Sequence, residues 1–494
     1  MIAAHLPILQ VAVPLVAAPL SVFCRRGATA WTLTFVVSIG AFLISIALLG
    51  QVLDQGVLSY QLGDWAAPWG IEYRVDAANA MVLLIISGIS TVVLPYARVS
   101  IAHEVEAHNQ TLFYTCYLLC LTGLLGMVIT GDAFNAFVFL EIASLSTYVL
   151  VAMGAKRDRR ALTAAYTYLV MGTIGATFFV IGVGLLYMMT GTLNMADLAE
   201  RIPAIGANRT LVVAFAFIVT GLGLKLALFP MHLWLPNAYA FAPSAVTVFL
   251  AATATKAAVY LLLRFLFTIF GTSFPTFEPT LTYLLLPLAV IAMFAASTVA
   301  IFQVDIKRML AYSSIAQLGY MVLGMSFATV TGLTATIIHL FNHALMKGAL
   351  FMALGAVVMR FGDATIDTMR GLGRVMPWTM AAFVAGGLSL IGMPLTVGFI
   401  SKWLLVTAAL ESGLWPIAVL VVASSLLAVI YIWRVVEAAY FEPPPEGVTA
   451  GEAPPALLIP TWILIGANIY FGIDASLTTR VAGEAARALL KTAS

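Results

Sequence analysis

The chain has 494 residues, of which 62% are hydrophobic and 9% are charged. An ordinary soluble domain carries about 25% charged residues, so this composition excludes a soluble protein and predicts an integral membrane protein. The formal net charge is only +2 and the basic residues are spread over many short loops, so the sequence gives no reason to expect a nucleic-acid partner.

Apolar runs of about 20 residues predict an all-α polytopic membrane protein with about 14 transmembrane helices. The first run has no basic residue before it and is followed by Arg25 and Arg26, which is the reverse of a signal peptide, so we expect it to be retained. The predicted spans are residues 5–24, 30–52, 77–97, 110–130, 133–153, 163–189, 210–235, 246–268, 281–302, 308–327, 331–358, 376–409, 415–440 and 456–473.

The distribution of lysine and arginine predicts the orientation, because inner loops are enriched in both. With the N-terminus outside, 13 basic residues fall on the inner side, 7 fall on the outer side and four lysines lie within spans. We therefore expect a multi-pass protein of the cell (inner) membrane with both termini outside. The inner set is Arg25, Arg26, Arg98, Lys156, Arg157, Arg159, Arg160, Lys307, Arg308, Arg360, Arg370, Arg374 and Arg434.

Two matched spacings indicate an internal repeat with an offset of five spans, although such spacings can also arise by chance. The matched pairs are Asp132/Glu141 with Asp305/Ser314, and Lys225/Pro230 with Ser389/Pro394. An odd offset inverts the second copy, as in many transporters. The expected organisation is an N-terminal three-helix segment (1–109), a first five-helix repeat (110–268), an inverted second repeat (281–440), and a last helix with a short C-terminal tail (441–494).

Pro230 and Pro394 interrupt the seventh and twelfth spans. Proline removes a backbone donor, which a bilayer tolerates only where the freed groups face protein or a watery cavity. Paired broken helices in the two halves of a chain point to an ion pathway. A simple packing kink is the alternative, and the lysines near both prolines favour the pathway.

Glu141 and Lys225 are candidate partners in such a pathway. Glu141 lies in the fifth span with Ser144 and Tyr148 on the same helical face, a polar stripe that suits water beside a carboxylate. Lys225 immediately precedes the break in the seventh span, and a carboxylate partner would make its charge depend on the geometry of the pair. A static buried salt bridge between two helices is the alternative.

Two further lysines lie inside spans. Lys256 is roughly ten residues into the eighth span, flanked by Thr253 and Thr255, and is too deep to reach the interface comfortably. Its own span holds no acid, so we expect water or a partner from another helix. Lys402 follows the break in the twelfth span and lies toward the outer side in the expected orientation.

The eleventh span carries His339, His343 and Lys347, which recur every four residues and therefore line one helical face. Histidine changes charge near neutral pH, and burial can bring lysine into the same range, so three such groups can pass protons through hydrogen-bonded water. Structural histidines with satisfied hydrogen bonds are the alternative.

We expect no metal and no redox cofactor on this chain. A zinc site on His339 and His343 would need a glutamate and further ligands that the sequence does not supply nearby. Cys116 and Cys120 are four residues apart on an apolar helix but have no other soft ligand near them, so we expect them to be packing residues.

Five segments along the chain resemble motifs of the antiporter-like membrane subunits. That family spans the Mrp-type multisubunit cation/proton antiporters and the proton-pumping arm of respiratory complex I. The resemblance covers roughly residues 76 to 440 and implies 14 helices with inverted five-helix repeats. The segments are TGDAFNAFVFLE, GLKLALFPMHLWLPNAYAFAPSAVT, DIKRMLAYSSIAQLGYM, HLFNHALMKGALF and GFISKW.

The resemblance assigns a proton relay residue by residue. The form TGDAFNAF, the chain length and the terminal lysine are most similar to the D-type member of Mrp-type Na⁺/H⁺ antiporters. This implies a transporter subunit that works in the lipid bilayer with a larger A-type subunit and small hydrophobic subunits, and that handles protons and Na⁺. The relay positions are Glu141, Lys225, Lys256, His339, His343, Lys347 and Lys402.

Three alternatives remain at this point. The first is a proton-pumping subunit of a complex I-type NADH:quinone oxidoreductase or membrane-bound hydrogenase, in which a redox reaction drives the same path. The second is a structural subunit that does not conduct, and the third is a self-sufficient transporter. Because the sequence shows no carboxylate cluster for sodium, we hypothesise that sodium crosses in a neighbouring subunit.

Overall fold

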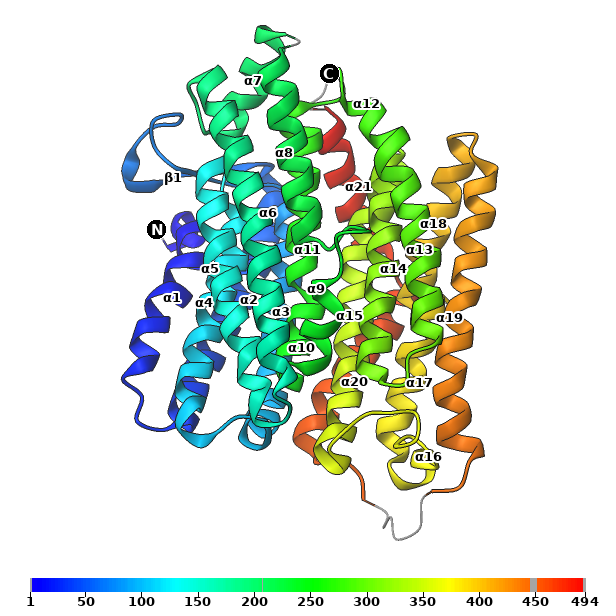
Figure 1. Cartoon of the computed structure of the whole chain (residues 1–494). Coiled ribbons are helices and arrows are strands. Elements are labelled where there is room, and N and C mark those ends of the chain that lie inside the picture. Colours follow the sequence, from blue (N-terminus) through cyan, green and yellow to red (C-terminus); the bar gives the residue numbers. More distant parts are fainter. Residues whose placement is uncertain (1, 207, 445–450, 492–494) are drawn as a thin grey trace.

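The computed structural model describes residues 2–206, 208–444 and 451–491. Residues 445–450 and 492–494 of the expected last segment, and residue 1 of the first, lie outside this description. The described chain is mostly helical, and the long helices lie side by side in one bundle (Figure 1). The expected all-α polytopic class is confirmed at this level.

The N-terminal part contains three long helices and one small hairpin, which the sequence analysis did not predict. Strand β1 (Leu58–Gln61) pairs antiparallel with β2 (Glu72–Val75), so that Leu58 lies opposite Val75. The hairpin lies outside the stack of helices in Figure 1. The helices are η1 (Ile2–His5), α1 (Leu6–Val22), α2 (Gly27–Gln55), η2 (Leu62–Asp64), α3 (Ala77–Glu104) and η3 (Ala107–Asn109).

The middle part contains the first helix break and the short helix α7, which the sequence analysis treated as a loop. Helix α8 ends at Lys225, and α9 begins only at Trp234. The elements are α4 (Gln110–Ile129), α5 (Ala133–Ala152), η4 (Met153–Lys156), α6 (Arg160–Thr190), α7 (Met195–Ile205), α8 (Arg209–Lys225), α9 (Trp234–Phe241), α10 (Ser244–Ala252), α11 (Ala254–Leu263) and η5 (Arg264–Phe270).

The last part contains the longest helix of the described chain, α15, and the second break, between α17 and α18. The residues after the last predicted span form a further helix, α21. The elements are α12 (Phe277–Pro279), η6 (Thr280–Leu285), α13 (Leu286–Ile301), α14 (Ile306–Ser326), α15 (Val330–Phe361), α16 (Leu372–Val375), α17 (Pro377–Ile391), α18 (Val397–Glu411), α19 (Trp415–Phe441), α20 (Pro455–Ile473) and α21 (Ser476–Lys491).

Among the described residues, 11 helices are long and apolar enough to cross a membrane, and each coincides with a predicted span. The other three predicted spans correspond to the interrupted pair α8 and α9, to the more polar α14, and to the interrupted pair α17 and α18. The 11 helices are Ala3–Val22, Gly27–Gln55, Ala77–Glu104, Ala107–Ile129, Ala133–Lys156, Arg160–Thr190, Ser244–Phe270, Phe277–Ile301, Val330–Phe361, Trp415–Phe441 and Pro455–Ile473.

Aspartates start two helices that the sequence analysis matched as repeat positions. The Asp132 carboxylate accepts a hydrogen bond from the Asn135 backbone N–H over 2.7 Å at the start of α5. The Asp305 carboxylate accepts one from the Arg308 N–H over 2.8 Å at the start of α14. Because an N-cap satisfies a backbone donor that the helix leaves free, both residues fix where their helices begin.

Helix α15 forms the centre of the second half and packs against α10, α14, α17, α18, α20 and α21. It is 32 residues long and is buried along almost its whole length. A helix that is apolar on every side is expected when other helices surround it, so each polar residue on α15 must find its partners inside the protein. This helix therefore holds the predicted line of titratable residues away from lipid.

Candidate functional site

The Glu141 and Lys225 side chains meet between α5 and α8, as the sequence analysis expected. Lys225 Nζ lies 3.3 Å from Glu141 Oε1 and donates to Ser144 Oγ over 2.7 Å. The Lys225 side chain is 7% exposed and that of Glu141 is 23% exposed. The lysine is therefore the enclosed partner, and the carboxylate reaches toward the surface of this chain.

The break after Lys225 keeps its backbone groups satisfied within the protein. The Trp234 indole N–H donates to the Leu224 carbonyl over 3.1 Å, and the Leu228 N–H donates to the Gly223 carbonyl over 2.8 Å. These bonds replace those that a continuous helix would make, which is the condition for irregular backbone at membrane depth. Lys225 thus stands at the end of a helix that stops inside the bundle.

Lys256 lies at a third break, which the sequence analysis missed. Thr253 has φ −127° and ψ −55°, so α10 ends before it and α11 begins after it. The buried Lys256 Nζ donates to the Ala251 carbonyl and, over 3.4 Å, to Thr255 Oγ1. The expected partner from another helix is replaced by a carbonyl of the lysine's own span, which the break has freed from helical pairing.

His339, His343 and Lys347, which we call the α15 line, are completely buried. The two imidazole rings lie 5.9 Å apart and nearly parallel, at 10°. A hydrogen bond of 2.8 Å joins His339 Nδ1 to Ser401 Oγ. His339 Nε2 and both ring nitrogens of His343 have no hydrogen-bond partner in the described chain.

Lys347 and Lys402 are held by backbone carbonyls and a hydroxyl. Lys347 Nζ donates to the Leu310 carbonyl of α14 over 2.7 Å and to Ser313 Oγ. Lys402 Nζ donates over 2.9 Å to each of two carbonyls in the last turn of α17, those of Leu390 and Ile391. A helix end leaves such carbonyls unpaired, so the second break supplies the acceptors that Lys402 needs.

These groups lie near one another across helices. Lys256 of α11 is close enough to His339, His343 and Lys347 of α15, and Lys402 of α18 is close enough to His339, for a charge on one to act on the other. Within the described ranges no hydrogen bond joins Lys225 to Lys256. The structure thus brings together the pair Glu141 and Lys225 and, separately, a set that extends from Lys256 along the α15 line to Lys402.

The sequence of this chain also matches a known protein family. Residues 130–428 match the model described as NADH:quinone oxidoreductase/Mrp antiporter, TM. The chain belongs to this family. All seven candidate residues lie inside the matched region.

Two relatives within this antiporter family differ in the complex they come from. The chain is 42% identical over 458 residues to the N subunit of the NADH-quinone oxidoreductase of Desulforudis audaxviator, and the match covers 91% of this chain and 89% of that protein. It is 33% identical over 433 residues to the D subunit of the Na⁺/H⁺ antiporter of Alkalihalophilus pseudofirmus, with 87% and 86% covered.

Similar solved structures likewise come from both an Mrp complex and a respiratory complex. A chain of the Mrp complex from Dietzia sp. superposes with a TM-score of 0.89 at 26% identity, covering 99% of this chain and 98% of that chain. A chain of the membrane-bound sulfane sulfur reductase, an archaeal respiratory membrane complex, superposes with a TM-score of 0.90 at 31% identity and the same coverage. The fold is therefore that of a subunit of multisubunit membrane complexes.

Three hydroxyl residues in this antiporter fold were not among the sequence candidates. Ser401 binds His339, Ser313 binds Lys347, and the Tyr320 ring centroid lies 5.0 Å from Lys402 Nζ. Ser401 directly precedes Lys402, and Ser313 lies in an AYSSI segment in the middle of α14. A serine next to a charged residue is thus the signal that could have identified Ser401, and a pair of serines inside a span is the signal for Ser313.

Cys120 and the wider set of metal-ligating side chains complete the description. Cys120 Sγ lies 3.3 Å from Thr147 Oγ1 of α5, which places this thiol in helix packing. Over the described ranges, no three side chains of His, Cys, Asp and Glu gather as a metal site would require.

Proposed function

We propose that this chain is the proton-translocating, D-type subunit of a multisubunit Na⁺/H⁺ antiporter, with protons relayed by Glu141, Lys225, Lys256, the α15 line and Lys402. The α15 line carries this proposal. Its two imidazoles and its lysine are completely buried, yet three ring nitrogens have no partner in the described chain. Burying a polar group without a partner costs free energy. The unpaired ring nitrogens therefore need water or a transferred proton as their partner.

The lysine sites support the same conclusion. Lys256, Lys347 and Lys402 are bound by carbonyl and hydroxyl oxygens rather than by carboxylates. An ammonium and a neutral amine can both donate to such oxygens, so the proton is not held by a full opposite charge. A chain of sites with modest preference for the charged state is what proton transfer requires.

The Glu141 and Lys225 pair differs from those sites because it carries a full opposite charge. Lys225 ends a broken helix, so a small movement of α8 or α5 would change the distance between the two charged groups. We propose that this pair controls access to the relay. Separation of the pair would favour release of the proton from Lys225, and contact would favour its return.

A second candidate is a proton-pumping subunit of a redox-driven complex. The 42% identity to a subunit of NADH-quinone oxidoreductase and the superposition on an archaeal respiratory complex favour it. Mass spectrometry of the complex purified through this chain in mild detergent distinguishes the two. A larger homologous subunit and small hydrophobic subunits without flavin or iron–sulphur proteins support the antiporter, and redox subunits overturn it.

A non-conducting structural role is tested by Lys225→Ala. Conduction predicts that sodium-dependent proton movement is lost while the complex still assembles on a native gel. Arg201→Ala is the control, because Arg201 forms an exposed salt bridge with Asp197 outside the site. Disassembly of the Lys225→Ala complex, or full transport by an assembled one, would count against conduction through this pair.

The finer architecture also belongs to this proposal: 14 spans, two inverted five-helix repeats, and both termini outside. The equivalent N-caps at Asp132 and Asp305 support the repeat, because each also forms an isolated bridge with a later loop, at Asn194 and Thr365. In a variant whose three native cysteines are replaced, single cysteines placed in the loop after η4 should react with a membrane-impermeant thiol reagent only from the inner side. Reaction from the outer side would reverse the orientation.

A further inference from the structure

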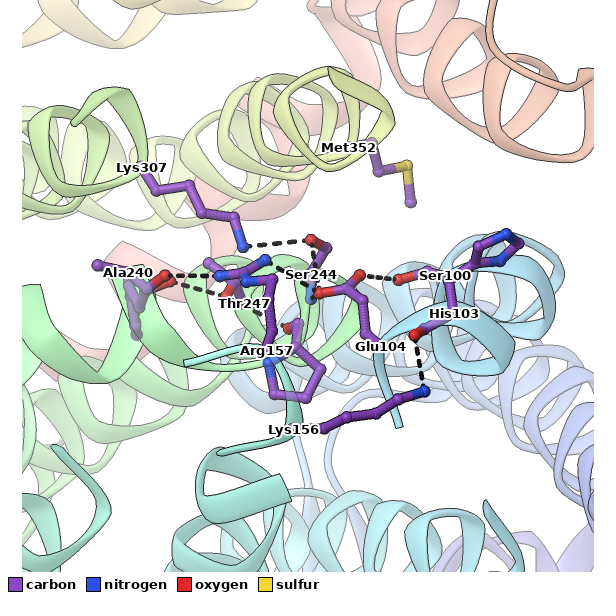
Figure 2. Close-up of polar contacts among 12 residues, drawn as sticks. Ser100, His103, Glu104, Lys156, Arg157, Ala240, Ser244, Thr247, Lys307 and Met352 are labelled. Atoms are coloured by element: carbon purple, nitrogen blue, oxygen red, sulfur yellow. Dashed lines mark hydrogen bonds and ion pairs between the residues drawn. The ribbon is translucent and has the colours of Figure 1, made fainter. Parts of the chain in front are cut away.

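Four buried or half-buried side chains from three helices and one loop meet at one end of the bundle (Figure 2). Glu104 is the last residue of α3, and Arg157 follows η4. Ser244 is the first residue of α10, and Lys307 is the second residue of α14. We call these four residues the Glu104 cluster. The relay described above uses none of them.

Ser244 lies between the carboxylate and the lysine. Its backbone N–H and its hydroxyl donate to Glu104 Oε2 over 2.9 and 3.1 Å, and Lys307 Nζ donates to Ser244 Oγ over 3.2 Å. Arg157 Nη1 lies 3.2 Å from the same Oε2 of Glu104. The cluster is therefore one hydrogen-bonded chain, which Figure 2 shows from Arg157 through Glu104 and Ser244 to Lys307.

Exposure falls along this chain from the loop to the interior. The Arg157 side chain is 23% exposed and that of Glu104 is 7% exposed. Ser244 and Lys307 are buried. The chain thus begins at a residue that solution reaches and ends at an enclosed ammonium.

The cluster holds more positive charge than a single ion pair between two segments would need. Glu104 and Arg157 already form such an ion pair. Lys307 adds a second cation, and its one hydrogen bond in the described chain is to the Ser244 hydroxyl. An enclosed cation without a carboxylate of its own is costly unless it can lose its proton. The other charged and titratable groups around the cluster are Tyr96, His103, Lys156 and Asp305.

The cluster lies against the end of α15 beyond Lys347. Lys307 precedes by three residues the Leu310 carbonyl that accepts from Lys347 Nζ, which is about one turn of α14. A Cβ atom on Gly355 of α15 would lie 2.8 Å from Ser244 Cβ, so the two backbones approach closely there. The hydrogen-bonded chain therefore points from the loops toward the α15 line.

We propose that the Glu104 cluster is a proton-loading site, which supplies the α15 line from the solution at the end of the bundle where Arg157 lies. This inference rests on the proposed proton relay and adds its point of access. Glu104 Oε2 takes a proton from solution when the Ser244 hydroxyl turns away from it toward the neutral Lys307 Nζ. The carboxyl proton then passes to Ser244 Oγ as the hydroxyl proton passes to Lys307 Nζ, which restores the hydrogen bonds seen in the structure. Glu104 is again a carboxylate, Ser244 is unchanged, and the Lys307 ammonium passes the proton through water to Lys347.

Two serines on the same carboxylate give a matched test. Ser244 Oγ lies between Glu104 and Lys307. Ser100 Oγ donates over 2.6 Å to the other oxygen of Glu104, Oε1, and in the described chain it makes no hydrogen bond to Lys307. In vesicles that contain the assembled complex, Ser244→Ala should lower sodium-dependent proton movement at least fivefold, while Ser100→Ala stays within twofold of wild type. Equal losses in both variants, or no loss in Ser244→Ala, would show a static tie and overturn the loading site.

Lys307→Arg gives a second test that remains informative if Ser244→Ala fails to assemble. Arginine keeps the charge and the hydrogen-bond donors of the site but does not release a proton. Loading predicts loss of transport with an assembled complex, and a purely electrostatic tie predicts normal transport. Glu104→Gln should also flatten the dependence of the rate on pH at this side, which a structural defect would not do.

Lys347→Ala, measured in the same vesicles, separates this inference from the proposed function. If Lys347→Ala abolishes transport and Ser244→Ala and Lys307→Arg do not affect it, the relay stands and the loading site is wrong. If Lys347→Ala itself transports normally, the relay fails, and the loading site fails with it.

Discussion

The charge of Glu141 should be required for transport, and Glu141→Gln tests this with little change of shape. At 3.3 Å from Lys225 Nζ, the carboxylate is the only full negative charge that pairs with a relay lysine in the described chain. Removing one partner of a buried ion pair costs about 3–5 kcal/mol. Because Glu141 is partly exposed, we use about 3 kcal/mol, which corresponds to roughly a hundredfold smaller population of charged Lys225.

The matched control is Ser144→Ala, which removes the other partner of Lys225 without removing charge. A hydrogen bond to a charged group contributes about 1.5–3 kcal/mol at most, and this one lies beside a carboxylate that can take over the donor. We therefore expect a loss of about tenfold or less in Ser144→Ala, against about a hundredfold in Glu141→Gln. The order of the two variants is the decisive quantity.

The assay is the initial rate of sodium-dependent proton movement in membrane vesicles, measured with a pH-sensitive dye and divided by the amount of assembled complex on a native gel. Both variants should assemble, because the side-chain volumes hardly change. The reasoning is refuted if assembled Glu141→Gln transports within twofold of wild type, or if Ser144→Ala loses as much as Glu141→Gln.

Three further predictions follow from individual contacts. Ser401→Ala removes the partner of His339 Nδ1 and should lower the transport rate about tenfold, which the vesicle assay measures. Gly355→Ala would place a Cβ 1.9 Å from Tyr96 Oη and should lower the melting temperature of the purified complex, whereas Gly184→Ala, with open space around it, should not. If sodium crosses in a neighbouring subunit, Ser401→Ala should lower the maximal rate without a large change in the sodium concentration that gives half of it.

Much of the fold could be predicted from the sequence because bilayer thickness fixes the length of an apolar run. Each of the 11 long apolar helices coincides with a predicted span. The breaks after Lys225 and before Lys402 could also be predicted, because proline or glycine residues occur at both positions. The β1–β2 hairpin, α7 and α21 were not predicted, since a short amphipathic or polar segment between spans or after the last one has no equally strong length requirement.

The candidate side chains could be predicted because a charge inside an apolar run is conspicuous, and Glu141 and Lys225 were expected to meet. Their surroundings were harder to predict. The break at Thr253 has no proline or glycine at that position, and a single threonine in a span usually stays helical. The partner of Lys256 is a carbonyl exposed by that break, so it could not be identified from any side chain.

The same reasoning explains how the chain keeps three of its four membrane lysines at that depth. Lys225, Lys256 and Lys402 each lie at or next to a break, and the breaks at Thr253 and after Ile391 provide the carbonyls that Lys256 and Lys402 bind. A helix end aims several carbonyls in one direction, which stabilises a cation without burying a second charge. Because these acceptors belong to the backbone, no neighbouring side-chain substitution can remove them. Mutational scans should therefore find Lys256 and Lys402 sensitive while the residues that supply their carbonyls, Ala251, Leu390 and Ile391, tolerate conservative change.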